Sequence, residues 1–273
     1  MASPQTPKRF DNWLIAGCGY TGTVLARRLV AAGKRVTITK RDRAEAQLLA
    51  EQLHAAEARS LDLATTQARA TDDTIVVCLA PPPTSQLAHF AETAQHLVYV
   101  SSTGVYAPGH GQLVDESYPL APTTKSGIAR LAAERELPPN TTILRAAGIY
   151  GPGRGLADRL RAGTYRIIGD GTAHVSRIHV DDLVVAIIAA GEQQPRGVFN
   201  AADDDPAPIG ELADALADHL HVPHPPRVPA DQVDAEVAGM LAADRRIDNT
   251  KLKTELGVAF RYPTARPTTG SST

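Results

Sequence analysis

The sequence predicts an α/β protein built on a doubly wound parallel sheet. Short apolar runs rich in β-branched residues alternate along the chain with segments whose apolar positions recur at helical spacing. Several of these runs are apolar throughout, which is typical of strands that helices cover on both faces. A glycine-rich turn joins the first run to the first helical segment. Together these three observations indicate the doubly wound class.

The first predicted unit is a strand, a turn, a helix and a second strand. The apolar run Trp13–Ala16 stops at a glycine, and the segment Tyr20–Ala32 has helical periodicity. Gly33 ends this helix, and the β-branched run Val36–Thr39 follows it as the next strand. This order of elements is a βαβ crossover.

The same alternation continues through the first half of the chain. The further helices and strands that we expect there are helix Ala44–His54, strand Arg59–Leu61, strand Thr74–Leu79, helix Gln86–Ala94, strand Leu97–Ser101, helix Thr124–Arg135 and strand Thr141–Leu144. Residues 11–150 are therefore predicted to form a dinucleotide-binding core of the Rossmann type. We assign residues 151–266 to a small C-terminal lobe on the substrate side, because prolines interrupt the chain from Asp203 onward. Within this lobe, 181–200 should return to the sheet as a helix and a strand, and 267–273 form a tail.

Composition and charge argue against several classes of partner. The 273 residues include 28 Lys and Arg against 30 Asp and Glu, and the basic residues form no stripe, so we expect no nucleic-acid partner. The two cysteines lie far apart in apolar surroundings, which predicts neither a disulfide framework nor a metal site. The longest apolar run, Leu183–Ala190, is far shorter than the roughly 20 residues of a membrane span. We expect a cytoplasmic protein without membrane contact, whose oligomeric state is left open, with a homodimer as one alternative.

A glycine motif predicts the cofactor site. Gly17, Gly19 and Gly22 match the pattern GxGxxG between the first strand and the first helix. In that place the glycines allow a tight turn, the approach of a pyrophosphate and close helix packing, while the amides at Tyr20 and Thr21 face the anion. The alternative is a glycine-rich turn that binds no ligand.

Basic residues after the second strand favour NADP over NAD. An acidic side chain at this position pairs with the ribose 2′-hydroxyl, whereas a cation accommodates a 2′-phosphate, and the chain has Lys40 and Arg41 there. A solvated basic loop is the competing interpretation. Asp62 either bonds the adenine edge or caps its own turn. We also place Leu79 and Ala80 in the cofactor site, at the end of the strand Thr74–Leu79.

Six segments together resemble the extended short-chain dehydrogenase/reductases, and in particular the atypical branch similar to NAD-dependent epimerases and dehydratases. They are Gly17–Gly22, Asp62–Leu63, Val100–Tyr106, Asp115–Pro119, Leu144–Gly153 and Arg177–Leu183. The resemblance runs from about Trp13 to Tyr262 and implies the fold and a nicotinamide cofactor. It does not define a substrate, because the family acts on nucleotide sugars, steroids and many other carbonyl compounds.

The same resemblance implies catalytic positions, two of which depart from the family. Ser102 matches the family's serine, but the pattern YGxSKxxAE aligns with a segment that has Ser126 in place of tyrosine and Arg130 in place of lysine. Residues 126 and 130 lie on one helical face, so both side chains could point into one cleft. A serine is a much weaker acid than tyrosine, and arginine cannot shuttle a proton. The alternative is a capping serine and a surface arginine on an ordinary helix.

Two tyrosines and two functions remain as candidates. Tyr106 and Tyr150 lie in glycine-rich turns, where either could replace the missing phenol or simply pack on a loop. The first function is an NADP-dependent oxidoreductase or epimerase that acts on a small polar carbonyl, alcohol or sugar-like substrate. The second is an NADP-binding sensor or structural protein without redox turnover.

Overall fold

The structure, a computed structural model, describes residues 11–62, 70–79, 90 and 92–267. Ala80 and most of the predicted helix Gln86–Ala94 lie outside the described residues, as do Leu63 and 268–273 of the predicted tail. Within the described part of the chain, no helix combines the length and the apolar character needed to cross a membrane.

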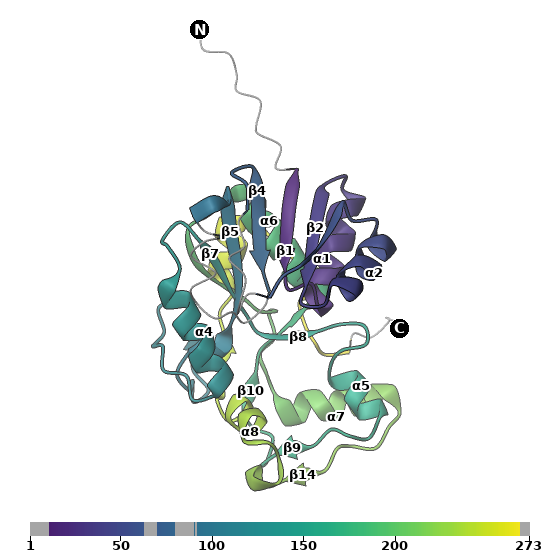
Figure 1. The fold of residues 1–273 in the computed structure, drawn as a ribbon. Helices are drawn as coiled ribbons and strands as arrows, with labels where there is room; N and C mark the ends of the chain where they lie inside the picture. Colours follow the sequence, from purple (N-terminus) through teal and green to yellow (C-terminus); the bar gives the residue numbers. More distant parts are fainter. Residues whose placement is uncertain (1–10, 63–69, 80–89, 91, 268–273) are drawn as a thin grey trace.

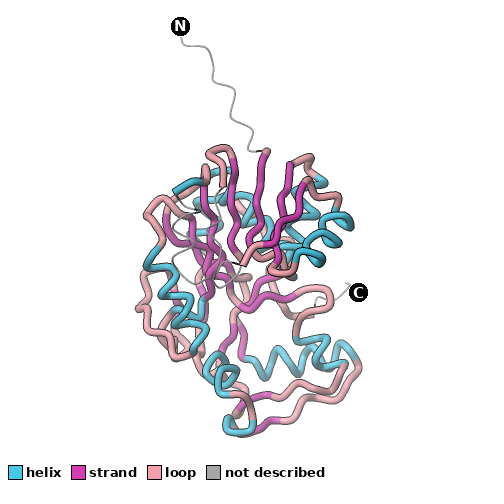
Figure 2. The backbone as a smooth tube through the Cα atoms, viewed as in Figure 1, coloured by secondary structure: helices cyan, strands magenta, loops and turns pink. Residues whose placement is uncertain are grey.

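Seven parallel strands form the central sheet, as the sequence predicts (Figures 1 and 2). Its spatial order is β12-β7-β5-β4-β1-β2-β3. The strands are β1 (Asn12–Ala16), β2 (Arg35–Lys40), β3 (Glu57–Ser60), β4 (Thr74–Cys78), β5 (His96–Ser102), β7 (Thr142–Ala146) and β12 (Gly197–Ala201). The chain runs outward from β1 on one side and from β4 on the other, so the strand order reverses between these two neighbours. In such sheets, ligands bind at this reversal, outside the carboxyl ends of the strands.

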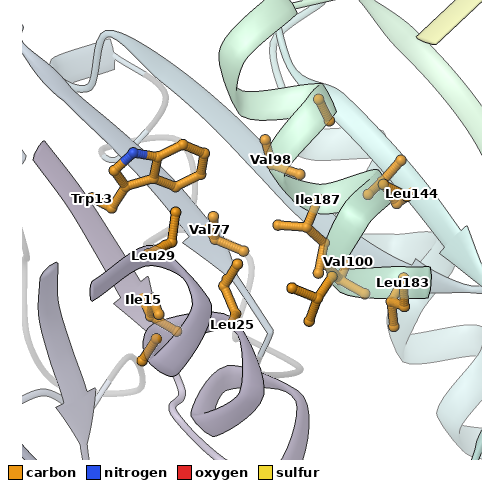
Figure 3. Packing of buried hydrophobic residues seen from close by; sticks show 14 of the residues in the cluster. Trp13, Ile15, Leu25, Leu29, Val77, Val98, Val100, Leu144, Leu183 and Ile187 are labelled. Carbon is orange, nitrogen blue, oxygen red and sulfur yellow. The ribbon is translucent and has the colours of Figure 1, made fainter. Parts of the chain in front are cut away.

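Helices cover both faces of the sheet. They are α1 (Tyr20–Ala31), α2 (Arg43–Leu53), α4 (Lys125–Glu136), α6 (Val180–Gln193) and α9 (Thr250–Leu256). Trp13 and Ile15 of β1 pack with α1, α6 and α9 in one cluster, whereas Leu14 and Ala16 pack in a second cluster that includes Ala133 of α4. Figure 3 shows the first of these clusters, between α1 and α6. Because β1 is buried on both faces, its sequence is apolar without alternation.

The remaining elements lie mostly below the carboxyl edge of the sheet in Figure 1. They are η1 (Thr103–Val105), β6 (Leu113–Val114), β8 (Gly148–Tyr150), α5 (Leu156–Arg161), β9 (Ile167–Ile168), β10 (His174–Val175), β11 (Arg177–His179), β13 (Ala207–Pro208), α7 (Ile209–Leu220), β14 (Arg227–Val228), η2 (Ala230–Gln232), α8 (Ala235–Leu241) and β15 (Arg246–Ile247). Helices α5 and α7 share a separate hydrophobic cluster with β9 and β13.

Two segments from the C-terminal half join the core. Helix α6 packs on the sheet and β12 pairs with β7, so both elements lie in the core. The sequence assigned α9 to the lobe, but Leu252 and Leu256 belong to the same cluster as Trp13. Helix α9 has only seven residues, and the spacing of its apolar positions is too short a pattern to show that it packs on the core.

Gly191 provides a test of the core. A Cβ atom at this position of α6 would lie 2.4 and 2.7 Å from ring atoms of the Trp13 indole. We expect Gly191→Ala to lower the free energy of unfolding by about 1 to 3 kcal/mol, because overpacking outweighs the gain in helix propensity. Urea denaturation measures this change. The control is Gly239→Ala in α8, where the nearest atom is a side-chain methyl of Thr124 at 3.1 Å; a Gly191→Ala variant as stable as this control would contradict the prediction.

Candidate active site

The glycine loop is fixed to the second strand by a threonine. The Gly17 N–H donates to Thr39 Oγ1 at 3.1 Å, and the Thr39 hydroxyl donates to the Ile15 carbonyl at 3.1 Å. The Cys18 N–H donates to the Thr39 carbonyl at 2.8 Å. Gly17 itself has a φ of +85°, which glycine adopts without strain. From the sequence Thr39 is expected only to lie in a strand, because its β-branched type does not indicate this role.

The amino end of α1 is open to an anion. Its N-cap, Gly19, supplies no side-chain cap, and the first turn contains no acidic residue. A Cβ at Gly19 would meet nothing within 4 Å, whereas one at Gly22 would lie 3.1 to 3.2 Å from Leu79, Cys18 and Ile15. The absence of a side chain at Gly19 therefore leaves open space next to the free backbone amides of α1. The absence of a side chain at Gly22 allows α1 to pack closely against the end of the sheet. Both features fit a dinucleotide pyrophosphate.

The other predicted cofactor residues border this end of the sheet. Lys40, the last residue of β2, places its Nζ 2.8 Å from Glu45 Oε2, and Arg41 is exposed. Asp62 is half-buried just beyond β3, and the Leu79 N–H donates to the Ala16 carbonyl at 2.9 Å. The Thr21 side chain is buried.

Tyr20 connects the glycine loop to the loop after β8. Its hydroxyl donates to the Pro152 carbonyl at 3.1 Å, and the Arg154 guanidinium lies 5.3 Å from the centre of its ring. A Cβ at Gly151 would lie 2.7 Å from the Tyr20 hydroxyl, so a larger residue there would separate the loops. The sequence placed Tyr20 in the cofactor site through its amide, and the structure adds this second contact.

Ser102 and Arg130 lie at the carboxyl end of β5. The Gly104 N–H donates to Ser102 Oγ at 3.0 Å, which leaves the hydroxyl proton available for a substrate oxygen. Arg130 Nη1 donates to the Val100 carbonyl at 2.5 Å. Helix α4 comes close to this point because Gly127 has no side chain: a Cβ there would lie 2.4 Å from the Gly104 carbonyl oxygen.

Ser126 has a different neighbour. Its hydroxyl donates to Glu236 of α8, whose carboxylate also accepts the N–H groups of Lys125 at 2.9 Å and Ser126 at 3.0 Å. The hydrogen bond from Ser126 holds the pKa of Glu236 below its usual range. By their spacing in the sequence, Ser126 and Arg130 could point into one cleft, or could be a capping serine and a surface arginine. In the structure Ser126 faces α8 while Arg130 faces β5, because a carboxylate 110 residues away occupies the amino end of α4.

The two candidate tyrosines lie in different surroundings. The Tyr106 side chain is fully buried, its hydroxyl donates to Asn200 Oδ1 at 2.7 Å, and burial raises its pKa to about 12. It packs in the core and not in a cleft, which differs from its expected place. Tyr150 lines a cavity, and its hydroxyl donates to the Thr264 carbonyl at 3.1 Å. Burial raises its pKa as well.

Further residues around the candidate site are buried or cap a helix. Arg145 and Glu134 form a buried ion pair of 2.7 Å, and the Arg145 guanidinium lies 4.7 Å from the centre of the Tyr106 ring. His179 caps α6, because its Nδ1 accepts the Asp181 N–H. Burial raises the pKa of Cys18 to about 11, which disfavours the thiolate form of this buried side chain.

Substitutions at Gly19 and Gly22 should affect different properties, namely cofactor binding and stability. Gly19→Val adds a side chain in open space with a φ of −95°, so the fold should persist while NADPH binding is lost. Gly22→Val places methyl groups against Leu79 and Cys18, so its main effect should be a loss of about 1 to 3 kcal/mol of stability. Calorimetric titration with NADPH and thermal unfolding separate these outcomes. Normal NADPH binding by a folded Gly19→Val protein would show that the motif is only structural.

Comparison with known proteins places the chain among enzymes. Residues 83–202 match the NAD dependent epimerase/dehydratase family, and residues 14–104 match a family described as NADP oxidoreductase coenzyme F420-dependent. A 3-diazoavenalumate denitrifying reductase from a Streptomyces species is 30% identical over 210 residues, which are 67% of this chain and 68% of the relative.

Solved structures agree in fold over almost the whole chain. A conserved protein of unknown function from Silicibacter pomeroyi has a TM-score of 0.78 at 30% identity, covering 94% of this chain and 95% of its own. The human epimerase family protein SDR39U1, isoform 2, solved with NADPH, has a TM-score of 0.76 at 20% identity, with 93% and 96% covered. The chain therefore belongs to the NAD dependent epimerase/dehydratase family of extended short-chain dehydrogenase/reductases, and it is an oxidoreductase or epimerase-type enzyme with a nicotinamide cofactor.

Proposed function

We propose that the protein is an NADP-dependent reductase of a small polar substrate. The observation that carries this proposal is the end of β2, where two cations stand beside the open amino end of α1. Asp42, the next acid along the sequence, is engaged, because its side chain accepts the Glu45 N–H at 2.8 Å as the N-cap of α2. With that carboxylate held by the helix, Lys40 and Arg41 suit a ribose 2′-phosphate better than a 2′-hydroxyl.

The residues of the chain restrict the reaction. NADPH, when bound, supplies the hydride. Ser102 orients a substrate oxygen with its free hydroxyl proton, and Arg130 adds fixed positive charge at the end of β5. No tyrosine stands at position 126, and the serine there donates to Glu236. Acceptors that need a strong proton donor, such as simple ketones, should react slowly.

A different acceptor class fits this arrangement. The name of the Streptomyces relative describes a reductase that denitrifies a diazo compound. When an aryl diazonium carbon accepts a hydride, a C–H bond forms, the C–N bond breaks and its electron pair leaves with N₂. The balance requires no proton from the protein. A diazo-substituted arene is therefore the acceptor that we propose, ahead of an ordinary carbonyl.

Kinetics with labelled cofactor tests the reaction. NADPH carrying deuterium at C4 should place deuterium on the arene carbon that loses N₂, with one NADPH oxidised per N₂ released. The comparison is an activated aldehyde in the same assay. Tight NADPH binding without turnover of either acceptor would support the alternative function, a sensor or structural protein.

Cofactor preference should depend on the Lys40–Glu45 pair. Lys40→Ala removes a cation from the 2′-phosphate and should weaken NADPH binding by about 1 to 3 kcal/mol. Glu45→Gln removes the competing carboxylate 2.8 Å from Lys40 Nζ and should strengthen it. Calorimetry with NADH is the control, because NADH lacks the 2′-phosphate and its affinity should not change. Equal affinities for NADPH and NADH in the unmodified protein would refute the NADP preference.

Restoring the family's proton donor should allow the protein to reduce carbonyl acceptors as well. The double variant Ser126→Tyr with Arg130→Lys should increase NADPH-dependent reduction of an activated aldehyde, by up to about 10² to 10⁴. Ser126→Ala should leave turnover nearly unchanged, because that serine bonds Glu236. Steady-state rates for the three proteins decide the matter. Rapid aldehyde turnover that Ser126→Ala abolishes would mean that the serine itself is the catalytic group.

A further inference from the structure

The cavity that Tyr150 lines lies beyond the loop that contacts Tyr20. It has a volume of about 650 Å³ and is lined by the end of β8, by α5 and α7, and by the chain from Arg261 to Pro267. Figure 1 shows α5 and α7 across from β8, near the C-terminal end of the described chain. Tyr150 lines this cavity, whereas Gly19, Lys40 and Ser102 do not. Its size is that of an ordinary small-molecule site.

The cavity combines an apolar wall with excess positive charge. Four leucines line it, namely Leu156, Leu212, Leu216 and Leu220. Five arginines line it as well, namely Arg154, Arg161, Arg177, Arg261 and Arg266, against one carboxylate, Asp158. A ligand that suits both features has an apolar body and an anionic group.

The arginines differ in whether acidic residues already neutralise them. Arg161 lies 3.9 Å from Asp158, and Arg266 lies 2.9 Å from Asp205. Across residues 11–62, 70–79, 90 and 92–267, the ion pairs found include none for Arg154, Arg177 or Arg261. The positive charge of these three side chains is therefore available to a bound anion.

Arg177 is the most informative of the three. Its Nε is buried and has no hydrogen-bond partner, and its guanidinium makes no ion pair with any described residue. Both carboxylate oxygens of nearby Asp203 are also buried without a partner, and burial raises the pKa of Asp203 to about 8. The ion pairs of the described residues include none between Asp203 and Arg177. Arg177 as a whole is partly buried, but a buried donor without a partner is costly in a folded protein, so the unpaired Nε beside a cavity points to a ligand.

The part of the cavity wall formed by Arg261, Tyr262 and Thr264 is held in place by contacts within the protein. Asp182 accepts the N–H groups of Arg261 at 2.9 Å and Tyr262 at 2.8 Å. The His179 ring stacks on Tyr262 with centroids 3.7 Å apart, and Tyr150 donates to the Thr264 carbonyl. A preformed wall of this kind lowers the ordering cost of binding.

We propose that this cavity binds a small organic carboxylate with an apolar or aromatic body, whose carboxylate pairs with Arg177. The planar guanidinium suits a carboxylate because it offers two parallel N–H donors. The site is separate from the cofactor site, so the proposal goes beyond the proposed reductase function and does not depend on it.

Calorimetric titration of the full chain with two matched probes tests the proposal. Biphenyl-4-carboxylate has the required charge, and biphenyl-4-carboxamide has the same shape without it. With NADPH at saturation, the carboxylate should bind at least tenfold more tightly than the carboxamide. Arg177→Gln should weaken carboxylate binding at least tenfold and leave the carboxamide unchanged. The matched control is Arg161→Gln, which should change carboxylate affinity less than threefold, because Asp158 already pairs with that arginine.

Each result decides for or against the site. Leu216→Trp fills the cavity and should weaken both probes, which keeps the test valid if Arg177→Gln fails to fold. Equal affinities for the two probes, no binding of either, or unchanged carboxylate affinity in folded Arg177→Gln would overturn the proposal. Loss of carboxylate binding when NADPH is added would place the probe in the cofactor site and would also overturn it. Because no readout is turnover, failure of the reductase function leaves these outcomes intact.

Discussion

The burial of β1 on both faces fixes the position of everything that follows. Trp13 and Ile15 pack against α1 and α6, and Leu14 packs on the opposite face, so the strand cannot shift without exposing one cluster. Its carboxyl end therefore gives the glycine loop a rigid starting point. The bond from Gly17 to Thr39 then ties that loop to β2, which sets the free amides of α1 beside Lys40. The cofactor site is thus a consequence of core packing.

A carboxylate positions helix α4, on the other side of the candidate site from the glycine loop. Helix α4 presents its amino end to α8, and Glu236 satisfies two of its free amides. This contact joins the C-terminal lobe to the core. It also uses the serine that replaces the family's tyrosine, so the lost proton donor has become part of a structural contact. In the proposed function, Ser102 and Arg130 orient the substrate, which favours acceptors whose reduction needs no strong acid.

Periodicity predicted the central sheet because neighbouring strands and helices obey local rules. The runs that became β1, β2, β4 and β5, and the helical spacing of α1 and α6, all appear within windows of about 15 residues. Contacts between distant segments could not be predicted this way. Tyr106 lies in a glycine-rich turn by sequence, yet Asn200, 94 residues later, holds its hydroxyl in the core. Glu236 and the packing of α9 were missed for the same reason, since a single sequence records no pairing between remote positions.

One loop separates the two sites. The Pro152 carbonyl accepts from Tyr20 on the cofactor side, while residues 150–155 line the cavity on the other. Arg154 belongs to both, because its guanidinium lies over Tyr20 and it also borders the cavity. A ligand that draws Arg154 toward its carboxylate would remove that cation from the Tyr20 ring, a contact of this kind being worth about 0.5 to 1 kcal/mol at exposed sites. The loop is therefore a wall that the two regions share.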